Sequence, residues 1–254
     1  FVHIHYDDWV GLYDYIQYPC ACTSHFGYLE REEMFGGYVN IANAFAKIQP
    51  RIFCLSEGIK KVYNVLMNIP KEKLFISPNG VNTTAFRSTD VPHNGDRSIY
   101  LAKIDYRKRQ HLFQSIDSLY YAGNIADERF DKEKNYLGEW SKEFLYNNLT
   151  EYGNLVLLSD GEAHPLVCME AFAAGLGVVV TEWGKANLDV DKEFITVIPE
   201  KHIGDLQFLE YEIVKNRLYS VQHREEILEY AEKFDWINIV RDHYIPNIEK
   251  VISK

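Results

Sequence analysis

Short apolar runs alternate with amphipathic stretches along the whole of this chain, and we find no internal repeat or low-complexity segment. A short apolar run bounded by turn residues is typical of a buried strand, whereas apolar residues three and four positions apart are typical of one helix face. Strands that alternate with helices in this way form strand-helix-strand units and a mostly parallel sheet. The sequence therefore predicts an α/β fold.

The chain is long and apolar enough to bury a substantial core. Its 254 residues are 46% hydrophobic and 14% aromatic, which excludes general disorder. At roughly 100 to 200 residues per domain, this length fits one large domain or two small ones. No apolar run approaches the roughly 18 residues that a membrane-spanning helix needs.

The chain is also acidic, with 27 Lys and Arg residues against 37 Asp and Glu residues and a formal charge of −10. Proteins dedicated to nucleic acids need a basic surface that displaces counterions from phosphates. We therefore expect no nucleic-acid partner, and an anionic ligand must be held by local donors.

A turn and a polar stretch divide the chain into two Rossmann-like domains, residues 1–92 and 93–233. Pro78-Asn79-Gly80 is a strong turn signal, and Thr83–Arg97 is rich in Asp, Asn, Thr and Pro. Two such domains place a ligand cleft at the carboxyl ends of both sheets. The expected strands are Val2–His5, Cys20–Ser24, Arg51–Ser56, Leu74–Ser77, Ser98–Ala102, Leu155–Ser159 and Val178–Thr181; the expected helices are Leu29–Ala46, Glu57–Leu66, Gln110–Leu119, Leu166–Ala174, Asp205–Asn216 and Arg224 to the end.

The most informative stretch is Asn154–Val180, which predicts a strand, a loop, a helix, a turn and a second strand. Pro165 suits the first helical turn and Gly175 suits the helix end. This geometry directs backbone N–H groups from about His164 to Val167, with the positive end of the helix dipole, into the cleft. An anion such as a diphosphate is stabilised there without Lys or Arg.

Two carboxylates flank this helix start, Glu162 in the loop and Glu170 on the helix. An ionised carboxylate only accepts hydrogen bonds, so this pair suits a ligand with hydroxyls on both sides of a diphosphate, as in a nucleotide sugar. Alternatively, Glu162 is a solvated loop residue and Glu170 a surface residue of the helix.

Glu162, seven further residues and Glu170 are followed by Ala-x-Ala-Ala-Gly-x-x-Val-Val. This pattern resembles the donor-site signature of retaining glycosyltransferases of the two-domain GT-B fold, in particular family four. The resemblance implies that Glu162 contacts sugar hydroxyls, that Glu170 contacts the ribose, and that amides near Leu166 and Val167 hold the diphosphate. His164 and Pro165 stand in the same donor-binding segment, where Phe-Gly is commoner.

Ile99–Gln110 resembles the first strand and loop of the family's donor domain. The resemblance places Lys103 and Lys108 as the two cations that bind the diphosphate. Cations beside the leaving diphosphate stabilise the charge that develops as the glycosidic bond breaks. Alternatively, Arg107-Lys108-Arg109 is a solvated basic turn.

Further matches extend the resemblance over nearly the whole chain. Phe53–Lys60 and Phe75–Phe86 resemble the last strand-helix unit of the first domain and the crossing to the second, and Phe234-Asp-Trp resembles the start of a last helix, 234–254, that returns to the first domain. Family members begin with further αβ units, so we expect the first domain to lack its N-terminal part.

His3, His5 and Asp7 have a spacing that occurs in metallohydrolases. We reject a metal site because no further cluster of His or Cys follows, and we interpret these residues as structural. His25 is different, because the resemblance places a histidine here near the donor sugar and the acceptor hydroxyl. The alternative is a strand-end histidine bonded to backbone.

Trp140 follows Tyr136-Leu-Gly-Glu, which is similar to the family's strand and loop near the nucleobase. An aromatic ring at this point either stacks on the base or fills the core.

Together with the resemblance, these observations predict a hexosyltransferase that moves a sugar from a UDP- or GDP-sugar to a hydroxyl acceptor, in the synthesis of a glycan or cell-surface polysaccharide. The resemblance implies that the anomeric configuration is retained. The acceptor is a sugar, a lipid-linked glycan or a small molecule. The expected catalytic residues are His25, Lys103, Lys108 and Glu162. We expect no metal and no cofactor beyond the nucleotide sugar, because protein groups supply the positive charge. The alternatives are a non-catalytic nucleotide-sugar binding module and an epimerase or phosphorylase of the same fold.

The cysteines predict a reducing compartment, since Cys20, Cys22, Cys54 and Cys168 lie in apolar runs without C-x-x-C spacing. We therefore expect a cytoplasmic protein. Peripheral contact with the inner membrane face stays open, because lysines of the first domain could touch an anionic surface.

Overall fold

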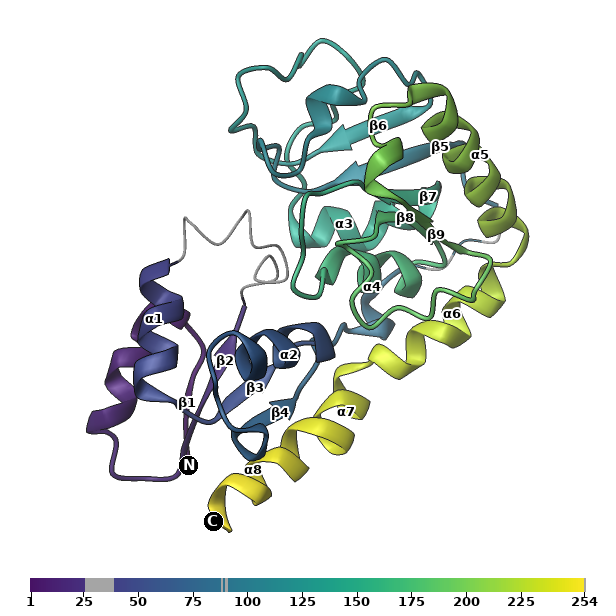
Figure 1. The fold of residues 1–254 in the computed structure, drawn as a ribbon. Coiled ribbons are helices and arrows are strands. Elements are labelled where there is room, and N and C mark those ends of the chain that lie inside the picture. Colours follow the sequence, from purple (N-terminus) through teal and green to yellow (C-terminus); the bar gives the residue numbers. More distant parts are fainter. Residues whose placement is uncertain (26–38, 88, 90, 254) are drawn as a thin grey trace. The chain divides into compact units, whose positions relative to one another are not determined.

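The computed structural model describes residues 1–25, 39–87, 89 and 91–253. They form two compact units, each built around its own parallel sheet (Figure 1). Unit 1 comprises residues 1–79, 161–164 and 236–254, and unit 2 comprises residues 80–160 and 165–235. The prediction of an α/β fold with two Rossmann-like domains is confirmed.

Unit 1 contains a four-stranded parallel sheet in the sequential order β1-β2-β3-β4. Its strands are β1 (Val2–Ile4), β2 (Cys20–Ser24), β3 (Ile52–Cys54) and β4 (Leu74–Ile76). Its α-helices are α1 (Val39–Ile48), α2 (Glu57–Val65), α7 (Trp236–Ile239) and α8 (Ile245–Ile252), joined by two 3-10 helices (Asp7–Tyr15 and Lys71–Lys73) and a π-helix (Val240–Tyr244). The four predicted strands are confirmed, each within two residues at its ends. The predicted helix Leu29–Ala46 is confirmed where it falls on α1, and its first part lies outside the described residues.

Both faces of this sheet are covered. Cys22 and Ile52 lie in one core with Phe45 of α1 and Ile59 of α2. On the other face, Phe53 lies in a second cluster with Val251 of α8. The alternation of side chains along each strand therefore divides the apolar residues between two helical layers.

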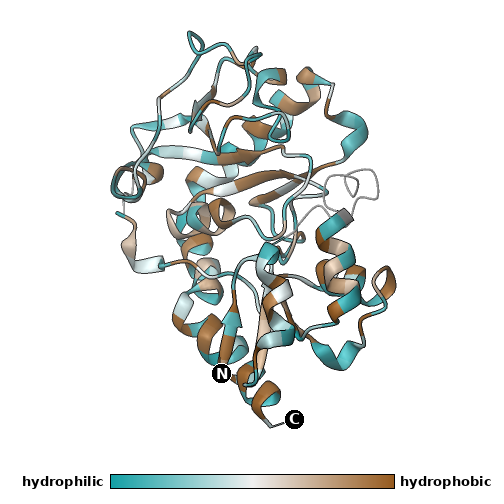
Figure 2. Cartoon of the chain, turned by 90° about the vertical axis from the view of Figure 1, so that its left-hand side faces the viewer, coloured by the Kyte–Doolittle hydropathy of each residue, from teal (hydrophilic) through white to brown (hydrophobic). Residues whose placement is uncertain are grey.

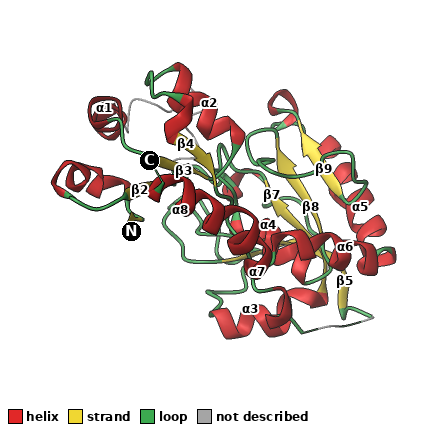
Figure 3. Ribbon diagram, turned by 90° about the horizontal axis from the view of Figure 1, so that it is seen from below, coloured by secondary structure: helices red, strands yellow, loops and turns green. Residues whose placement is uncertain are grey.

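Unit 2 contains a five-stranded parallel sheet in the order β6-β5-β7-β8-β9. Its strands are β5 (Asn94–Leu101), β6 (Leu119–Ala122), β7 (Tyr152–Leu157), β8 (Gly177–Thr181) and β9 (Ile195–Ile198), and its α-helices are α3 (Lys142–Asn148), α4 (Leu166–Ala173), α5 (Leu206–Gln222) and α6 (Arg224–Ala231). Figure 3 shows α4 and α5 on opposite sides of β7 and β8.

The central strands are buried, which explains their unbroken apolar sequences. Every residue of β7 and β8 is buried, as expected for parallel strands covered on both faces. Figure 2 shows the strands largely in apolar or neutral colours, while the helices carry polar and apolar segments in turn. On α5, the buried residues Leu209, Ile213 and Asn216 recur at helical spacing and face the sheet.

The strand order creates a topological switch point between β5 and β7. The chain leaves β5 towards β6 on one side and later returns to β7 on the other side of β5. Loops that follow such a pair of strands diverge, and ligands of open α/β sheets bind in the crevice they leave. The loops after β5 and β7 contain most of the residues that the sequence predicts for the donor site.

The predicted helix Gln110–Leu119 is wrong. Only Gln110–Leu112 forms a 3-10 helix, and the chain continues in tight turns in which the N–H of Ile116 donates to Phe113 O at 3.1 Å. Ser115, Asp117 and Ser118 are weak helix formers that compete for backbone hydrogen bonds. The apolar spacing that suggested a helix here instead buries Phe113 and Ile116 from successive turns.

The domain boundary also differs from the predicted one at residue 92. Residues 80–92 belong to unit 2. There Val81 pairs with Asp235, the Thr83 hydroxyl donates to the Asp235 carboxylate at 2.8 Å, and the Arg87 N–H donates to Tyr146 O at 2.9 Å. The polar composition of this stretch thus reflects hydrogen bonding to unit 2. The predicted helix from Arg224 to the end of the chain is interrupted at Asp235, whose backbone is not helical, with φ of −57° and ψ of 137°.

All four cysteines are buried thiols, as predicted. None of the helices in the described ranges combines the length and the apolar composition that crossing a bilayer requires.

Gly123 lies after β6 with φ of +141°, and a Cβ atom there would come within 2.0 Å of the Ala102 carbonyl oxygen. Gly138 has φ of +82°, but nothing lies within 4 Å of its Cβ position. We expect Gly123→Ala to lower the free energy of unfolding by about 3 kcal/mol or more, because backbone must move. Gly138→Ala is the matched control. It should lower the free energy of unfolding by only about 1–2 kcal/mol, because alanine disfavours a positive φ but meets no neighbouring atom there. Equal losses of unfolding free energy in the two variants, measured by chemical denaturation, would contradict this explanation.

Candidate functional site

The loops after β5 and β7 are tied together at the carboxyl edge of the unit 2 sheet. The N–H of Asp160 donates to Arg107 O at 2.9 Å. Arg109 donates from Nε to Leu158 O and from Nη2 to Ser159 O, both at 3.0 Å, and from Nη1 to the Glu200 carboxylate at 2.5 Å. One arginine therefore fixes the end of β7 against the β5 loop.

Lys103 and Lys108 both belong to this β5 loop. Lys103 is exposed beyond the end of β5, whereas Lys108 is buried at 9% exposure. The Lys108 backbone is held at both ends, because its N–H donates to the Asp105 carboxylate at 3.0 Å and its carbonyl accepts from the Tyr100 hydroxyl at 2.5 Å. The alternative of a solvated basic turn is therefore wrong for Lys108 and for Arg109.

The start of α4 has backbone donors that no side chain caps among the described residues. Pro165 is the N-cap and makes no side-chain hydrogen bond. By contrast, Ser56, Ser141 and Asp205 each accept a backbone N–H at the starts of α2, α3 and α5. The first N–H groups of a helix need a partner, and an anion is a suitable one. Leu166 is exposed and Val167 is half-buried, so their amides remain candidates for the diphosphate.

Glu170 lies one turn further along α4 and is buried, with 7% exposure. Its carboxylate forms an ion pair with the ammonium group of Lys142, the first residue of α3. The alternative of a surface helix residue is therefore wrong. No spacing rule links two residues so far apart in sequence, and Lys142 was missed for that reason.

Trp140 is half-buried between the loop and α3. Its ring packs edge-on against the Phe144 ring, with 5.1 Å between the ring centroids, and its centroid lies 5.9 Å from that of the Tyr152 ring. It also lines a small cavity of about 150 Å³ together with Leu137 and Glu151. The ring thus packs against the core, and base stacking stays a prediction.

Glu162 and His164 belong to a short loop that is part of unit 1. Glu162 is half-buried and His164 is buried. The Asn79 N–H donates to His164 Nδ1 at 3.0 Å, and the Asn79 side-chain amide donates to the His164 carbonyl at 3.2 Å. Because Nδ1 accepts, a neutral ring carries its proton on Nε2. His164 therefore fixes the loop to the Pro78-Asn79-Gly80 turn, and contact of His164 with the donor stays a prediction.

His25 follows β2 in unit 1 and its side chain is exposed. Its N–H donates to the Asp7 carboxylate at 3.1 Å. Desolvation and then the nearby His5 lower the pKa of His25, while a hydrogen bond with the His5 backbone opposes them. The backbone-bonded alternative and the catalytic prediction are thus both compatible with this geometry.

His3 has a structural environment, as we interpreted from the sequence. One ring nitrogen lies 2.6 Å from the Tyr244 hydroxyl and the other lies 2.7 Å from the Thr23 hydroxyl. Burial, followed by His5 and His25, lowers the pKa of His3 to about 4, so the ring is neutral at neutral pH. In the part of the chain that the structure describes, no group of three or more His, Cys, Asp or Glu side chains could hold a metal ion.

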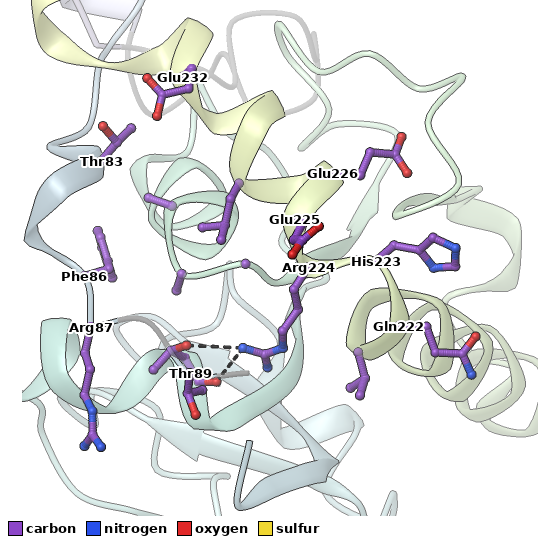
Figure 4. Close-up of a pocket in the computed structure, with 16 residues that line it drawn as sticks. Thr83, Phe86, Arg87, Thr89, Gln222, His223, Arg224, Glu225, Glu226 and Glu232 are labelled. Atoms are coloured by element: carbon purple, nitrogen blue, oxygen red, sulfur yellow. Dashed lines mark hydrogen bonds between the residues drawn. The ribbon is translucent and has the colours of Figure 1, made fainter. Parts of the chain in front are cut away.

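A cavity of about 710 Å³ lies elsewhere in unit 2, at the opposite end of α4 (Figure 4). Gly175 and Arg224 line it, and the Arg224 guanidinium donates to Thr150 O at 2.8 Å and to Tyr152 O at 2.6 Å. The cavity therefore faces the carboxyl end of α4, and none of the predicted donor-site residues lines it.

Comparison with solved structures identifies the architecture. The chain superposes on sucrose-phosphate synthase from Thermosynechococcus elongatus with a TM-score of 0.76 at 16% identity, over 98% of this chain and 73% of that one. Anabaena HepE in complex with UDP and glucose gives a TM-score of 0.73 at 11% identity, over 97% of this chain and 77% of HepE. The chain has the GT-B fold.

A further match is the pneumococcal O-GlcNAc transferase GtfA in complex with UDP and GlcNAc, with a TM-score of 0.67 at 14% identity, over 92% of this chain and 53% of GtfA. No protein-family model matches the sequence, and no curated protein matches it either. The GT-B architecture of this chain is therefore recognised through its structure, at sequence identities that show the fold alone.

Asp7 gives a prediction for unit 1. Burial raises the pKa of Asp7 from 3.8 to about 6, although the hydrogen bond from His25 opposes this rise. The folded state therefore binds the Asp7 proton more tightly than the unfolded state, and folding loses stability as the pH rises from about 4 to about 6. That loss is up to about 3 kcal/mol.

Asp7→Asn keeps an acceptor for His25 and removes the titration. Relative to this variant, the wild type should lose up to about 3 kcal/mol of unfolding free energy between pH 4 and pH 7, measured by urea denaturation. Asp14→Asn changes an exposed carboxylate of the same 3-10 helix and serves as control. A wild-type to Asp7→Asn difference that does not change with pH would refute the assignment.

Proposed function

We propose that this chain is a retaining glycosyltransferase that transfers a sugar from a nucleotide-diphosphate sugar to a hydroxyl acceptor. The observation that carries the proposal is a buried carboxylate, Glu170, one turn after a helix start that lacks a side-chain cap. Both features follow β7, at the switch point of the unit 2 sheet. An anion-binding helix start next to a hydroxyl acceptor suits the diphosphate and the ribose of a nucleotide.

The charges of unit 2 support the same ligand. Most of the excess of acidic residues lies in this unit, yet Lys103 and Lys108 both lie in the loop that follows β5. A diphosphate would be repelled by the unit as a whole and must be held by these local groups. The bound UDP named for HepE and GtfA makes a uridine nucleotide the first donor to test.

The proposed chemistry needs little more than electrostatic stabilisation. Lys103, Lys108 and the amides of Leu166 and Val167 stabilise the negative charge that develops on the departing diphosphate. The departing phosphate oxygen takes the proton of the acceptor hydroxyl, so the protein supplies no nucleophile. Glu162 accepts hydrogen bonds from the sugar hydroxyls, and His25 approaches the sugar and the acceptor.

Retention of configuration and a role in glycan or cell-surface polysaccharide synthesis come from the resemblance in sequence. A cytoplasmic location rests on the four cysteines, which lack C-x-x-C spacing. The absence of a catalytic metal rests on the positive charge that protein groups supply. Trp140 is proposed to lie beside the base.

Replacing Glu170 tests donor binding. Glu170→Ala removes a charged acceptor from the ribose hydroxyls and should weaken binding of UDP by about 1.5–3 kcal/mol, or roughly 10- to 150-fold, in isothermal titration calorimetry. Glu143→Ala removes an exposed carboxylate of α3 as the control and should leave the affinity unchanged. Equal affinity of wild type and Glu170→Ala for UDP would count against the proposed site.

Replacing Glu162 tests transfer rather than binding. Glu162→Gln keeps the size of the side chain and removes its charge. Release of UDP from UDP-glucose should slow by about 10-fold or more, because a charged hydrogen bond to the sugar is worth more in the transition state than in the ground state. The affinity for UDP should stay within about threefold of the wild type. The rate is measured by coupled detection of UDP. A variant that only melts at a lower temperature, with an unchanged rate, would show that Glu162 is structural.

A further inference from the structure

Lys142 occupies a defined position at the start of α3. Ser141 caps this helix by accepting the Phe144 N–H at 3.1 Å. The Lys142 ammonium pairs with Glu170 Oε1 and lies 5.9 Å from the centroid of the Tyr146 ring, one turn along the same helix. Its place is therefore set by the helix cap, by the carboxylate and by an aromatic neighbour.

The two side chains of this ion pair differ in how much of their surface is exposed. The Glu170 side chain is 9% exposed and the Lys142 side chain is 64% exposed. Among the residues that the structure describes, Lys142 provides the one hydrogen-bonded contact of the Glu170 carboxylate. A buried carboxylate needs such a partner, because an unpaired charge away from water is costly. The Lys142 side chain keeps much of its surface open to solvent.

The two groups are complementary in hydrogen bonding. A carboxylate only accepts, and an ammonium group only donates, with three N–H groups. Each hydroxyl of a vicinal diol has one hydrogen to donate and oxygen lone pairs to accept. A hydroxyl placed beside this pair can donate to Glu170 and accept from Lys142 at once. A carboxylate alone would accept the hydrogen of the hydroxyl and leave the lone pairs of its oxygen without a donor.

We propose that Lys142 is a specificity-determining residue that reads the ribose diol of the donor nucleotide together with Glu170. This inference rests on the proposed function, since it needs a nucleotide at Glu170. It predicts that the chain distinguishes ribonucleotides from 2′-deoxyribonucleotides, and that this discrimination depends on Lys142. A lysine that merely joined α3 to α4 would affect stability and leave the discrimination unchanged.

The test is calorimetric titration of the full chain with UDP and with 2′-deoxy-UDP. The wild type should bind UDP about 10-fold or more tightly than 2′-deoxy-UDP. In Lys142→Met this ratio should fall to within about twofold, chiefly through weaker binding of UDP. Lys142→Arg keeps the positive charge and the donors, and should retain most of the ratio.

Lys132→Met changes an exposed lysine of the same unit and is the control, with the ratio of the wild type expected. If Lys142→Met does not fold, Lys142→Gln takes its place, because it removes the charge and keeps a polar side chain. The ratio should then fall in Lys142→Gln and be retained in Lys142→Arg. Binding of UDP with an unchanged ratio in the Lys142 variants would overturn this inference alone. Failure of the wild type to bind UDP would reject the proposed uridine donor, and this inference with it.

Discussion

A carboxylate buried in the second turn of α4 is the constraint on which the candidate site depends. Glu170 is 93% removed from solvent, so a positive group must reach it or the charge would destabilise the fold. Lys142 meets this need and thereby connects the start of α3 with α4. The same short region brings together an uncapped helix start, a negative charge and a positive charge. Such a region offers donors and acceptors to a ligand that carries both phosphate and hydroxyl groups.

The surrounding loops are held firmly at the carboxyl ends of the strands. Arg109 binds the last carbonyls after β7 and also the Glu200 carboxylate, and Thr181 at the end of β8 donates to Ser159 O at 2.7 Å. A site on such supports keeps its geometry without the ligand, which reduces the entropy lost on binding. Arg224 has a comparable structural role at the far end of α4, where it closes one side of the cavity in Figure 4.

Much of this architecture could be predicted from the sequence, because parallel strands buried on both faces are unbroken apolar runs. The helix Leu166–Ala174 and the strand Val178–Thr181 were predicted to within one residue at each end, since Pro165 and Gly175 mark the two ends of α4. The strand predicted at Leu155–Ser159 begins three residues earlier and ends two residues earlier, as β7. Gln110–Leu119 was mispredicted because its apolar spacing also fits successive tight turns. The Lys142–Glu170 pair and the Asn79–His164 contacts could not be predicted, because they join residues that only the fold brings together.

The most direct measurement of the central claim is a crystal structure of this chain soaked with UDP. The account predicts that the diphosphate lies at the N–H groups of Leu166 and Val167 and that the ribose hydroxyls lie within hydrogen-bond distance of the Glu170 carboxylate. UDP bound in the cavity beside Arg224, or anywhere else away from the start of α4, would contradict it.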